Sequence, residues 1–212
     1  KMKICDWKNY KFLNKKIVDG IQKRKKTINP FCFLSLIDNP KKHKIAAELY
    51  AGQNKNSEHL NNNFSGLNKI KIGYFSGDIC DHAILHLTLD IFKYHDKSKF
   101  EIYAFYSGAK EDRWTEKAKV YFNKFFNVSN LSGEEIASLS RKNKIDISIN
   151  CAGYTLYGQN EAFNHRTSSI QINYLGYPGT MGDKCHDYII ADKFVLPKEE
   201  ASNYTEKILY LP

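Results

Sequence analysis

Apolar residues follow a helical period in the first part of the chain. Across residues 7–26 they recur three or four positions apart, at Tyr10, Leu13, Ile17 and Ile21, with lysines at many of the positions between them. Pro30 ends this pattern. A short apolar turn at residues 31–37 then leads to a second helix over residues 38–50, which Asp38 or Asn39 could cap. We therefore expect a small helical appendage at the start of the chain.

The pattern changes after a polar stretch. Residues 52–68 are rich in Gly, Asn and Ser and predict a linker. Beyond them, the apolar residues predict strands at 70–75, 100–106, 124–128, 145–150, 169–174 and 188–191, and helices near 82–94, 113–121 and 133–142. Strands that alternate with helices are typical of a parallel sheet covered on both faces. We predict an α/β fold with a helical connector and linker at residues 1–68 and a sheet lobe at residues 69–212.

Charge and cysteine content narrow the classes of protein that this sequence fits. The net charge of +9 would suit an anionic partner, but the lysine-rich stretches alternate with acidic residues and no recognised nucleic-acid motif accompanies them. The five cysteines include no C-x-x-C pair, which is typical of reduced thiols. No apolar run is long enough to span a membrane, and the first residues lack the apolar segment of a signal peptide. We expect a cytoplasmic protein with no nucleic-acid or membrane partner.

Three turns follow predicted strands and should meet at one edge of the sheet. They cover residues 76–86, 150–155 and 175–182. Ligands of open parallel sheets bind beyond the carboxyl ends of the strands, where helix N-termini also offer free N–H groups. The first turn carries the carboxyl group of Asp78 and the imidazoles of His82 and His86. These side chains are our candidates for a functional site.

Each of these three residues also has a structural interpretation. An Asp after Ser-Gly is an ordinary turn or cap residue, and spacing alone leaves open whether one His caps the helix and the other packs in the core. Apolar residues nearly surround the helix that follows, which predicts a buried helix. Two histidines four residues apart can bind a metal ion, but no Glu stands between them and no third ligand is evident, so we predict no metal. In the functional interpretation, Asp78 orients a hydroxyl acceptor or takes its proton, with His82 as the neighbouring titratable group.

The third turn contains three glycines. Gly176, Gly179 and Gly182 permit positive φ and a close approach of the backbone to a ligand, and Pro178 stiffens the loop between them. The turn matches neither G-x-G-x-x-G nor a Walker sequence, so it gives no support for a dinucleotide or P-loop site. A tight loop of purely structural use remains the alternative. For Arg166, the structural alternative is a solvated surface charge.

These turns resemble the O-linked N-acetylglucosamine transferase and SPINDLY family of glycosyltransferases. The resemblance covers nearly the whole chain and is carried by residues 5–7 with Tyr10, 72–78, Asp81 and His82 with His86, 99–103, Asn150 with 153–155, Arg166 with 169–171, 175–182, 187–192 and 204–207. The Gly-Tyr-Pro-Gly-Thr-Met-Gly block, in order with the Asp-x-x-x-His turn, is far more specific than a lone short motif.

The resemblance implies a fold and a reaction. It implies the first Rossmann-like lobe of a GT-B glycosyltransferase, preceded by a helical connector. The implied reaction is inverting transfer of a sugar, N-acetylglucosamine or in some members fucose, from a nucleotide sugar to a Ser or Thr hydroxyl of a protein. We expect the transferred sugar to be N-acetylglucosamine and the donor to be UDP-N-acetylglucosamine, with no metal or other cofactor.

The resemblance also implies roles for single residues. His82 would lie near the sugar and the acceptor, Asp78 would accept or relay the proton, and His86 would lie on the peptide side. Leu175 and Gly176 would line the sugar. The substrate-binding set is completed by Arg166, Tyr177 and Pro178.

The implied partners are an acceptor protein or peptide, a second catalytic lobe and upstream tetratricopeptide repeats. In the family the second lobe carries most of the nucleotide-sugar contacts, so we expect the 212 residues alone to be inactive. Two other functions stay open. One is a non-catalytic Rossmann-like module that holds a sugar or phosphate with the Gly176 loop, and the other is an interaction domain whose lysine-rich helices dock an acidic protein.

Overall fold

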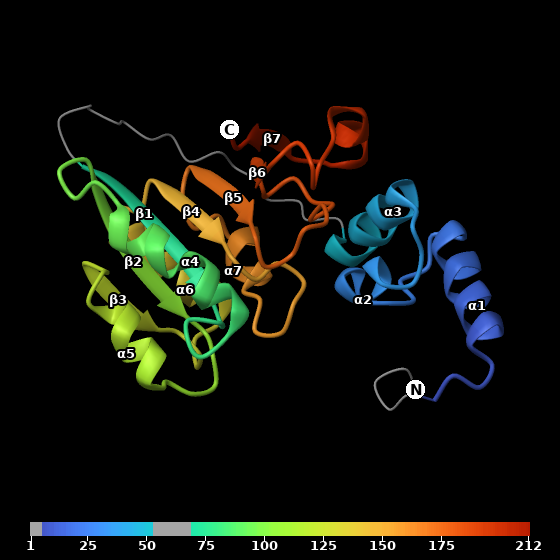
Figure 1. The fold of residues 1–212 in the computed structure, drawn as a ribbon, viewed down its shortest axis with the longest axis horizontal. Helices are drawn as coiled ribbons and strands as arrows, with labels where there is room; N and C mark the ends of the chain where they lie inside the picture. Colours follow the sequence, from blue (N-terminus) through green and yellow to red (C-terminus); the bar gives the residue numbers. More distant parts are fainter. Residues whose placement is uncertain (1–5, 53–68) are drawn as a thin grey trace.

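The computed structural model describes residues 6–52 and 69–212 (Figure 1). Except for Gly52, the predicted linker lies outside the described residues, and so does the predicted boundary at residue 68. The described parts form an α/β lobe and a group of three helices beside it (Figure 1).

A seven-stranded parallel sheet forms the lobe. Its strands are β1 (Ile70–Ser76), β2 (Phe100–Tyr106), β3 (Lys124–Asn127), β4 (Ile147–Asn150), β5 (Ile170–Tyr174), β6 (Tyr188–Ala191) and β7 (Lys207–Tyr210). They lie in the order β3-β2-β1-β4-β5-β6-β7, and every neighbouring pair is parallel. The strand order therefore reverses between β1 and β4, where open α/β sheets bind their ligands. The first six strands confirm the sequence prediction, while β7 was not predicted.

Helices cover both faces of this sheet. Alternate β1 residues point to opposite faces, so Ile72 and Tyr74 pack under α4 (Ala83–Tyr94) and α5 (Arg113–Lys119), whereas Phe75 packs under the other pair of helices. That pair is α6 (Gly133–Lys142) and α7 (Asn160–Asn164). The 3₁₀ helix η2 (Lys198–Asn203) precedes β7. Neither α7 nor η2 was predicted.

The helix α4 is not buried all round, contrary to the sequence prediction. Leu85, Thr88 and Phe92 form its buried face, but Leu87 is 64% exposed and Tyr94 is also exposed. Because α4 lies on the outside of the sheet, only one of its faces can pack. In the described part of the chain, no helix has both the length and the apolar content needed to cross a membrane.

The three N-terminal helices are α1 (Tyr10–Gln22), α2 (Pro30–Leu34) and α3 (Pro40–Ala51). Asn29 caps α2, and Asn39 caps α3 by accepting the Lys42 N–H at 3.0 Å, which resolves the choice between Asp38 and Asn39. These helices share an apolar cluster with the lobe, in which Leu34, Ala47 and Tyr50 meet loop residues Tyr154, Tyr177 and Met181. The predicted appendage therefore packs directly on two of the turns of the candidate site.

Candidate functional site

The turn after β1 holds Asp78 and His82 at the point where the strand order reverses. The Asp78 N–H donates to the Ser76 hydroxyl at 3.0 Å, which closes the turn. His82 is the N-cap of α4, and its Nδ1 accepts the Ile84 N–H at 3.3 Å. The capping interpretation of one His is thus confirmed. The cap fixes the imidazole at the start of α4 while the ring stays exposed.

Asp78 and His82 lie close together without a direct hydrogen bond. The distance from Asp78 Oδ1 to His82 Nδ1 is 3.8 Å, beyond hydrogen-bond range but within range of a charge interaction. Burial raises the pKa of Asp78, and the nearby His82 opposes this shift. A carboxylate with a raised pKa is a better proton acceptor near neutral pH than an ordinary surface Asp. The geometry therefore suits proton transfer to Asp78 from a hydroxyl group that enters this turn.

Two cysteines near Asp78 are poor candidates for a nucleophile. Burial raises the pKa of Cys151 to about 12, and burial together with Asp112 and Asp78 raises the pKa of Cys80. The thiolate, not the thiol, is the reactive form of cysteine. Both side chains therefore remain thiols at neutral pH.

His86 lies on the exposed side of α4 and is not a core residue. Its Nε2 lies 2.9 Å from Asp81 Oδ1, and its ring packs edge-on against Trp114 with centroids 4.6 Å apart. The Asp81 N–H donates to Asp112 Oδ2 at 2.8 Å, which ties the β1 turn to the capping box of α5. Thus His82 and His86 lie next to different carboxylates. Among the described residues, no group of three or more His, Cys, Asp or Glu could hold a metal.

The three predicted turns form one continuous surface at the carboxyl ends of β1, β4 and β5. The loop after β4 packs on the β1 turn, since a Cβ at Gly77 would lie 2.4 Å from Tyr157 Cβ. The same loop supports the third turn, because a Cβ at Gly176 would lie 2.0 Å from the Cys151 carbonyl oxygen. The prediction that these turns meet at one sheet edge is therefore confirmed.

The glycines of the third turn serve packing more than unusual backbone angles. Only Gly182 has a positive φ, of 67°, and there a Cβ would collide with the backbone of α3 at Ala47. A Cβ at Gly179 would lie 2.5 Å from the Tyr177 hydroxyl. Leu175 takes the positive φ instead, at 77°, and is half-buried. Of the three glycines that permit a positive φ, only Gly182 adopts one, and close contacts to protein select glycine at Gly176 and Gly179.

Tyr177 and Pro178 are placed very differently. The Tyr177 side chain is fully buried against Phe31 and Tyr154, while Pro178 is exposed at the surface of the loop. Tyr177 therefore shapes the loop from beneath and Pro178 faces outward. Leu175 and Gly176 directly follow β5, and Gly176 packs against the Cys151 carbonyl of the loop after β4.

Arg166 does not join the other candidates. It precedes β5, at the opposite edge of the sheet, and is only 4% exposed. Its guanidinium donates to both carboxylate oxygens of Asp187, at 2.9 and 2.8 Å, and to the carbonyls of Cys185 and Ser169. Neither a solvated surface charge nor a side chain in the cleft fits this position. We assign Arg166 a structural role, as the cation that holds the starts of β5 and β6 together.

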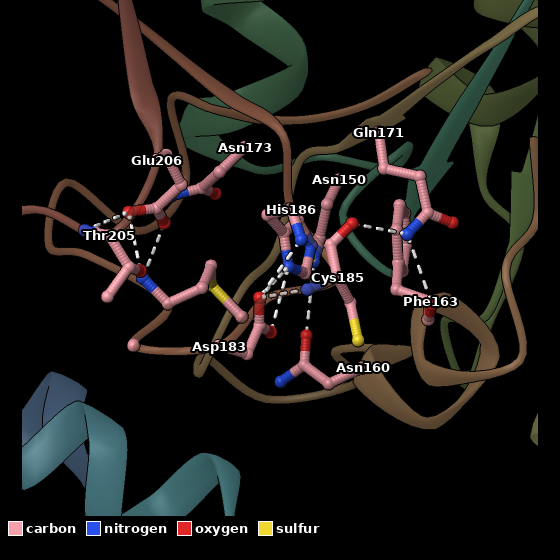
Figure 2. Close-up of polar contacts among 12 residues, drawn as sticks. Asn150, Asn160, Phe163, Gln171, Asn173, Asp183, Cys185, His186, Thr205 and Glu206 are labelled. Atoms are coloured by element: carbon pink, nitrogen blue, oxygen red, sulfur yellow. Dashed lines mark hydrogen bonds and ion pairs between the residues drawn. The ribbon is translucent and has the colours of Figure 1, made fainter. Parts of the chain in front are cut away.

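A buried polar network beneath the second and third turns was not predicted (Figure 2). His186 lies between Asp183, which is 3.0 Å from its Nδ1, and Asn150, whose Nδ2 is 3.0 Å from its Nε2. Nearby, the Glu206 carboxylate accepts the Thr180 hydroxyl at 2.6 Å and the Met181 N–H at 2.6 Å. Asp183 and His186 are three residues apart, but the other partners lie 25 to 36 residues apart along the chain, so periodicity gives no signal for them. The position of Asn150 at the end of a strand was the only available clue.

Comparisons with known proteins identify relatives of the entire chain. The profile of glycosyl transferase family 41 matches residues 4–212. The Caenorhabditis elegans UDP-N-acetylglucosamine–peptide N-acetylglucosaminyltransferase is 30% identical over 234 residues, which cover 99% of this chain and 20% of the relative. The probable enzyme of the same name, SEC, from Arabidopsis thaliana is 34% identical over 148 residues, covering 69% of this chain and 15% of the relative. This chain thus spans only a fifth or less of these relatives.

A solved structure has the same fold. A mutant of the Thermobaculum terrenum O-GlcNAc transferase superimposes with a TM-score of 0.78 at 22% identity, over 82% of this chain and 34% of that chain. The probable SPINDLY transferase of Arabidopsis thaliana is 26% identical over 147 residues, which are 68% of this chain and 16% of the relative.

Proposed function

The chain belongs to glycosyl transferase family 41, and from this premise we propose that it forms the acceptor-side lobe of an inverting protein O-glycosyltransferase. The lobe takes part in transfer of N-acetylglucosamine from UDP-N-acetylglucosamine to a Ser or Thr hydroxyl. The relatives that carry this activity in their names support the choice of sugar. The single observation that carries the proposal is the Asp78–His82 pair at the reversal of strand order, on the same sheet edge as the 175–178 loop.

In this proposal, the chain's own residues act on the acceptor. Asp78 takes the hydroxyl proton, which its raised pKa favours. The imidazole of His82, held by its cap bond, orients the hydroxyl group and the sugar. His86 and Trp114 form the peptide side of the cleft, while Leu175, Gly176 and Pro178 line the sugar. Buried Tyr177 supports that loop from below.

The leaving diphosphate needs electrostatic stabilisation that these residues do not offer. Asp78, Asp81 and Asp112 make the β1 turn locally anionic, which suits a proton acceptor and disfavours a diphosphate. We therefore propose that a second lobe, which supplies most donor contacts, and tetratricopeptide repeats belong to the working enzyme. The match covers only 15% and 20% of the two relatives, which supports the proposal that the working enzyme has further domains. A cytoplasmic location is part of the proposal.

Acceptor binding by the chain itself tests this function. A serine-containing acceptor peptide added to ¹⁵N-labelled chain should shift the amide signals of residues 78–86 and 114. His82→Ala should weaken the binding, while His165→Ala should not, because His165 is exposed on another loop. Signals that respond to UDP-N-acetylglucosamine at residues 175–182 and not to the peptide would favour the non-catalytic sugar-binding module instead.

A further inference from the structure

The orientation of the Asn150 side chain is fixed by backbone groups. Asn150 is the last residue of β4 and is fully buried. Its Oδ1 accepts the N–H groups of Ala152 at 3.1 Å and Gly153 at 2.8 Å. Because a backbone N–H can only donate, the oxygen must face these two residues and the Nδ2 must face the other way. That Nδ2 donates to Asn160 Oδ1 at 3.1 Å and points at His186 Nε2, 3.0 Å away (Figure 2).

This orientation determines the tautomer of His186. Since Asn150 Nδ2 is a donor, His186 Nε2 must accept and carries no proton. The ring proton then lies on Nδ1, which faces the Asp183 carboxylate at 3.0 and 3.1 Å. Asp183 Oδ1 also accepts the N–H groups of Cys185 and His186, both at 2.9 Å, so the carboxylate is held in place. The geometry therefore selects one neutral form of the imidazole.

Several charged groups surround the ring. Burial of the ring lowers the pKa of His186, while Asp183 and the more distant Glu206 and Asp187 raise it, with a net upward shift. Asp187 is itself paired with Arg166, and Glu206 is held by Thr180 and Met181. Phe163 of α7 stacks on the imidazole with centroids 4.9 Å apart and adds no charge. The bond from Asn150 favours the neutral ring and opposes the upward shift.

The Asn150 turn supports the loop of the candidate sugar site. Gly153 has a φ of 55° and packs so closely on Tyr177 that a Cβ would lie 2.5 Å from Tyr177 Cβ. The Gly153 carbonyl accepts the Asn160 Nδ2 at 2.9 Å. The Cys151 carbonyl oxygen packs against Gly176 and leaves no space there for a Cβ. Any shift of residues 151–153 would therefore move the backbone of Gly176 and Tyr177.

We propose that His186, as its neutral Nδ1–H tautomer, is a positioning residue that holds the 150–153 turn beneath the 175–178 loop, and that protonation of Nε2 releases this turn. A protonated Nε2 would place two donors against each other, because Asn150 cannot turn its amide without leaving the Ala152 and Gly153 N–H groups unpaired. The consequence for sugar transfer rests on the proposed function. The tautomer and the release do not.

Long-range ¹H–¹⁵N spectra of histidine-labelled chain test the tautomer directly. For His186 at pH 8, we expect one protonated nitrogen, Nδ1, and one unprotonated nitrogen, Nε2. On acidification, loss of the free Nε2 signal should coincide with loss of hydrogen-exchange protection at the amides of Ala152 and Gly153. A ring with the proton on Nε2, or one that is charged at pH 8, would overturn the proposal. Protection that is unchanged when the ring charges would also overturn it.

Matched substitutions separate positioning from simple packing. His186→Gln keeps an acceptor near the Nε2 position, whereas His186→Phe fills the space without one. In His186→Phe we expect protection at Ala152 and Gly153 to fall about tenfold, as for loss of a buried hydrogen bond, with most of it restored in His186→Gln. His165→Phe is the control at an exposed His and should change nothing. Equal protection in the Phe and Gln variants would contradict the positioning role. If His186→Phe does not fold, the acid titration of the unmodified chain decides the same question.

Discussion

Substitution of Arg166 by Met should destabilise the chain without any ligand present. The guanidinium is 4% exposed and makes two bonds to Asp187 and one each to the carbonyls of Ser169 and Cys185, all at 2.7–2.9 Å. Removal of one partner of a buried ion pair leaves an uncompensated charge and costs about 3–5 kcal/mol. We expect about 3 kcal/mol, the lower end, because Asp187 stays partly hydrated and keeps the Gln171 N–H as a donor at 2.8 Å.

Urea unfolding followed by far-UV circular dichroism measures this loss, provided that the m value is unchanged. The matched control is Arg113→Met on the exposed surface of α5, which should change stability by less than about 0.5 kcal/mol. Adding Asp187→Asn to Arg166→Met should restore about 1–2 kcal/mol by removing the unpaired charge. An Arg166→Met chain as stable as the control, but with weaker substrate binding, would refute the structural assignment and restore the substrate-binding role.

Three further predictions follow from the described contacts. Gly153→Ala should destabilise the chain by about 2–4 kcal/mol, because a Cβ there adds left-handed backbone strain and overlaps with Tyr177. In the control Gly52→Ala only the backbone strain is present, and thermal unfolding compares the two variants. Burial raises the pKa of Asp78 in the folded chain above its value in the unfolded chain, so the stability falls as the pH rises through the folded pKa. Asp78→Asn should therefore stabilise the chain at pH 7 but not at a pH below the ordinary pKa of Asp, and urea unfolding at both pH values tests this. The 212 residues alone should give no transfer from radiolabelled UDP-N-acetylglucosamine to an acceptor peptide, and measurable transfer would show that no second lobe is needed.

Much of the lobe could be predicted from the sequence because its strands carry strong local patterns. The alternation from Ile70 to Phe75 and the patterns of the helices predicted near 113–121 and 133–142 depend on neighbours in sequence. Two of the elements that escaped prediction carry weak local patterns: α7 has only five residues, and none of the four residues of β7 is fully buried. Their positions depend on packing against distant parts of the chain.

In the candidate site, too, some features could be predicted from local sequence and others depend on long-range contacts. The spacing of Asp78 and His82 after a strand was visible in the sequence, and parallel topology then brought their turn beside residues 150–155 and 175–182. The environment of Arg166 was not visible, since Asp187 lies 21 residues further on and nothing local marks the pair. Likewise, Gly176 is required by the Cys151 carbonyl, a contact between two loops. Long-range contacts decide which polar residues are buried.

The central claim is that the turn containing Asp78 supplies the proton acceptor for sugar transfer. The most direct measurement is kcat/KM for transfer of N-acetylglucosamine to a serine peptide by the longer protein proposed above, with Asp78→Asn compared with Asp90→Asn. Asp90 is an exposed carboxylate on the same helix as His86 and serves as the control. We predict a loss of about 10²- to 10⁴-fold for Asp78→Asn, with an unchanged fold, and no loss for Asp90→Asn. Equal kcat/KM for the two variants would contradict the claim.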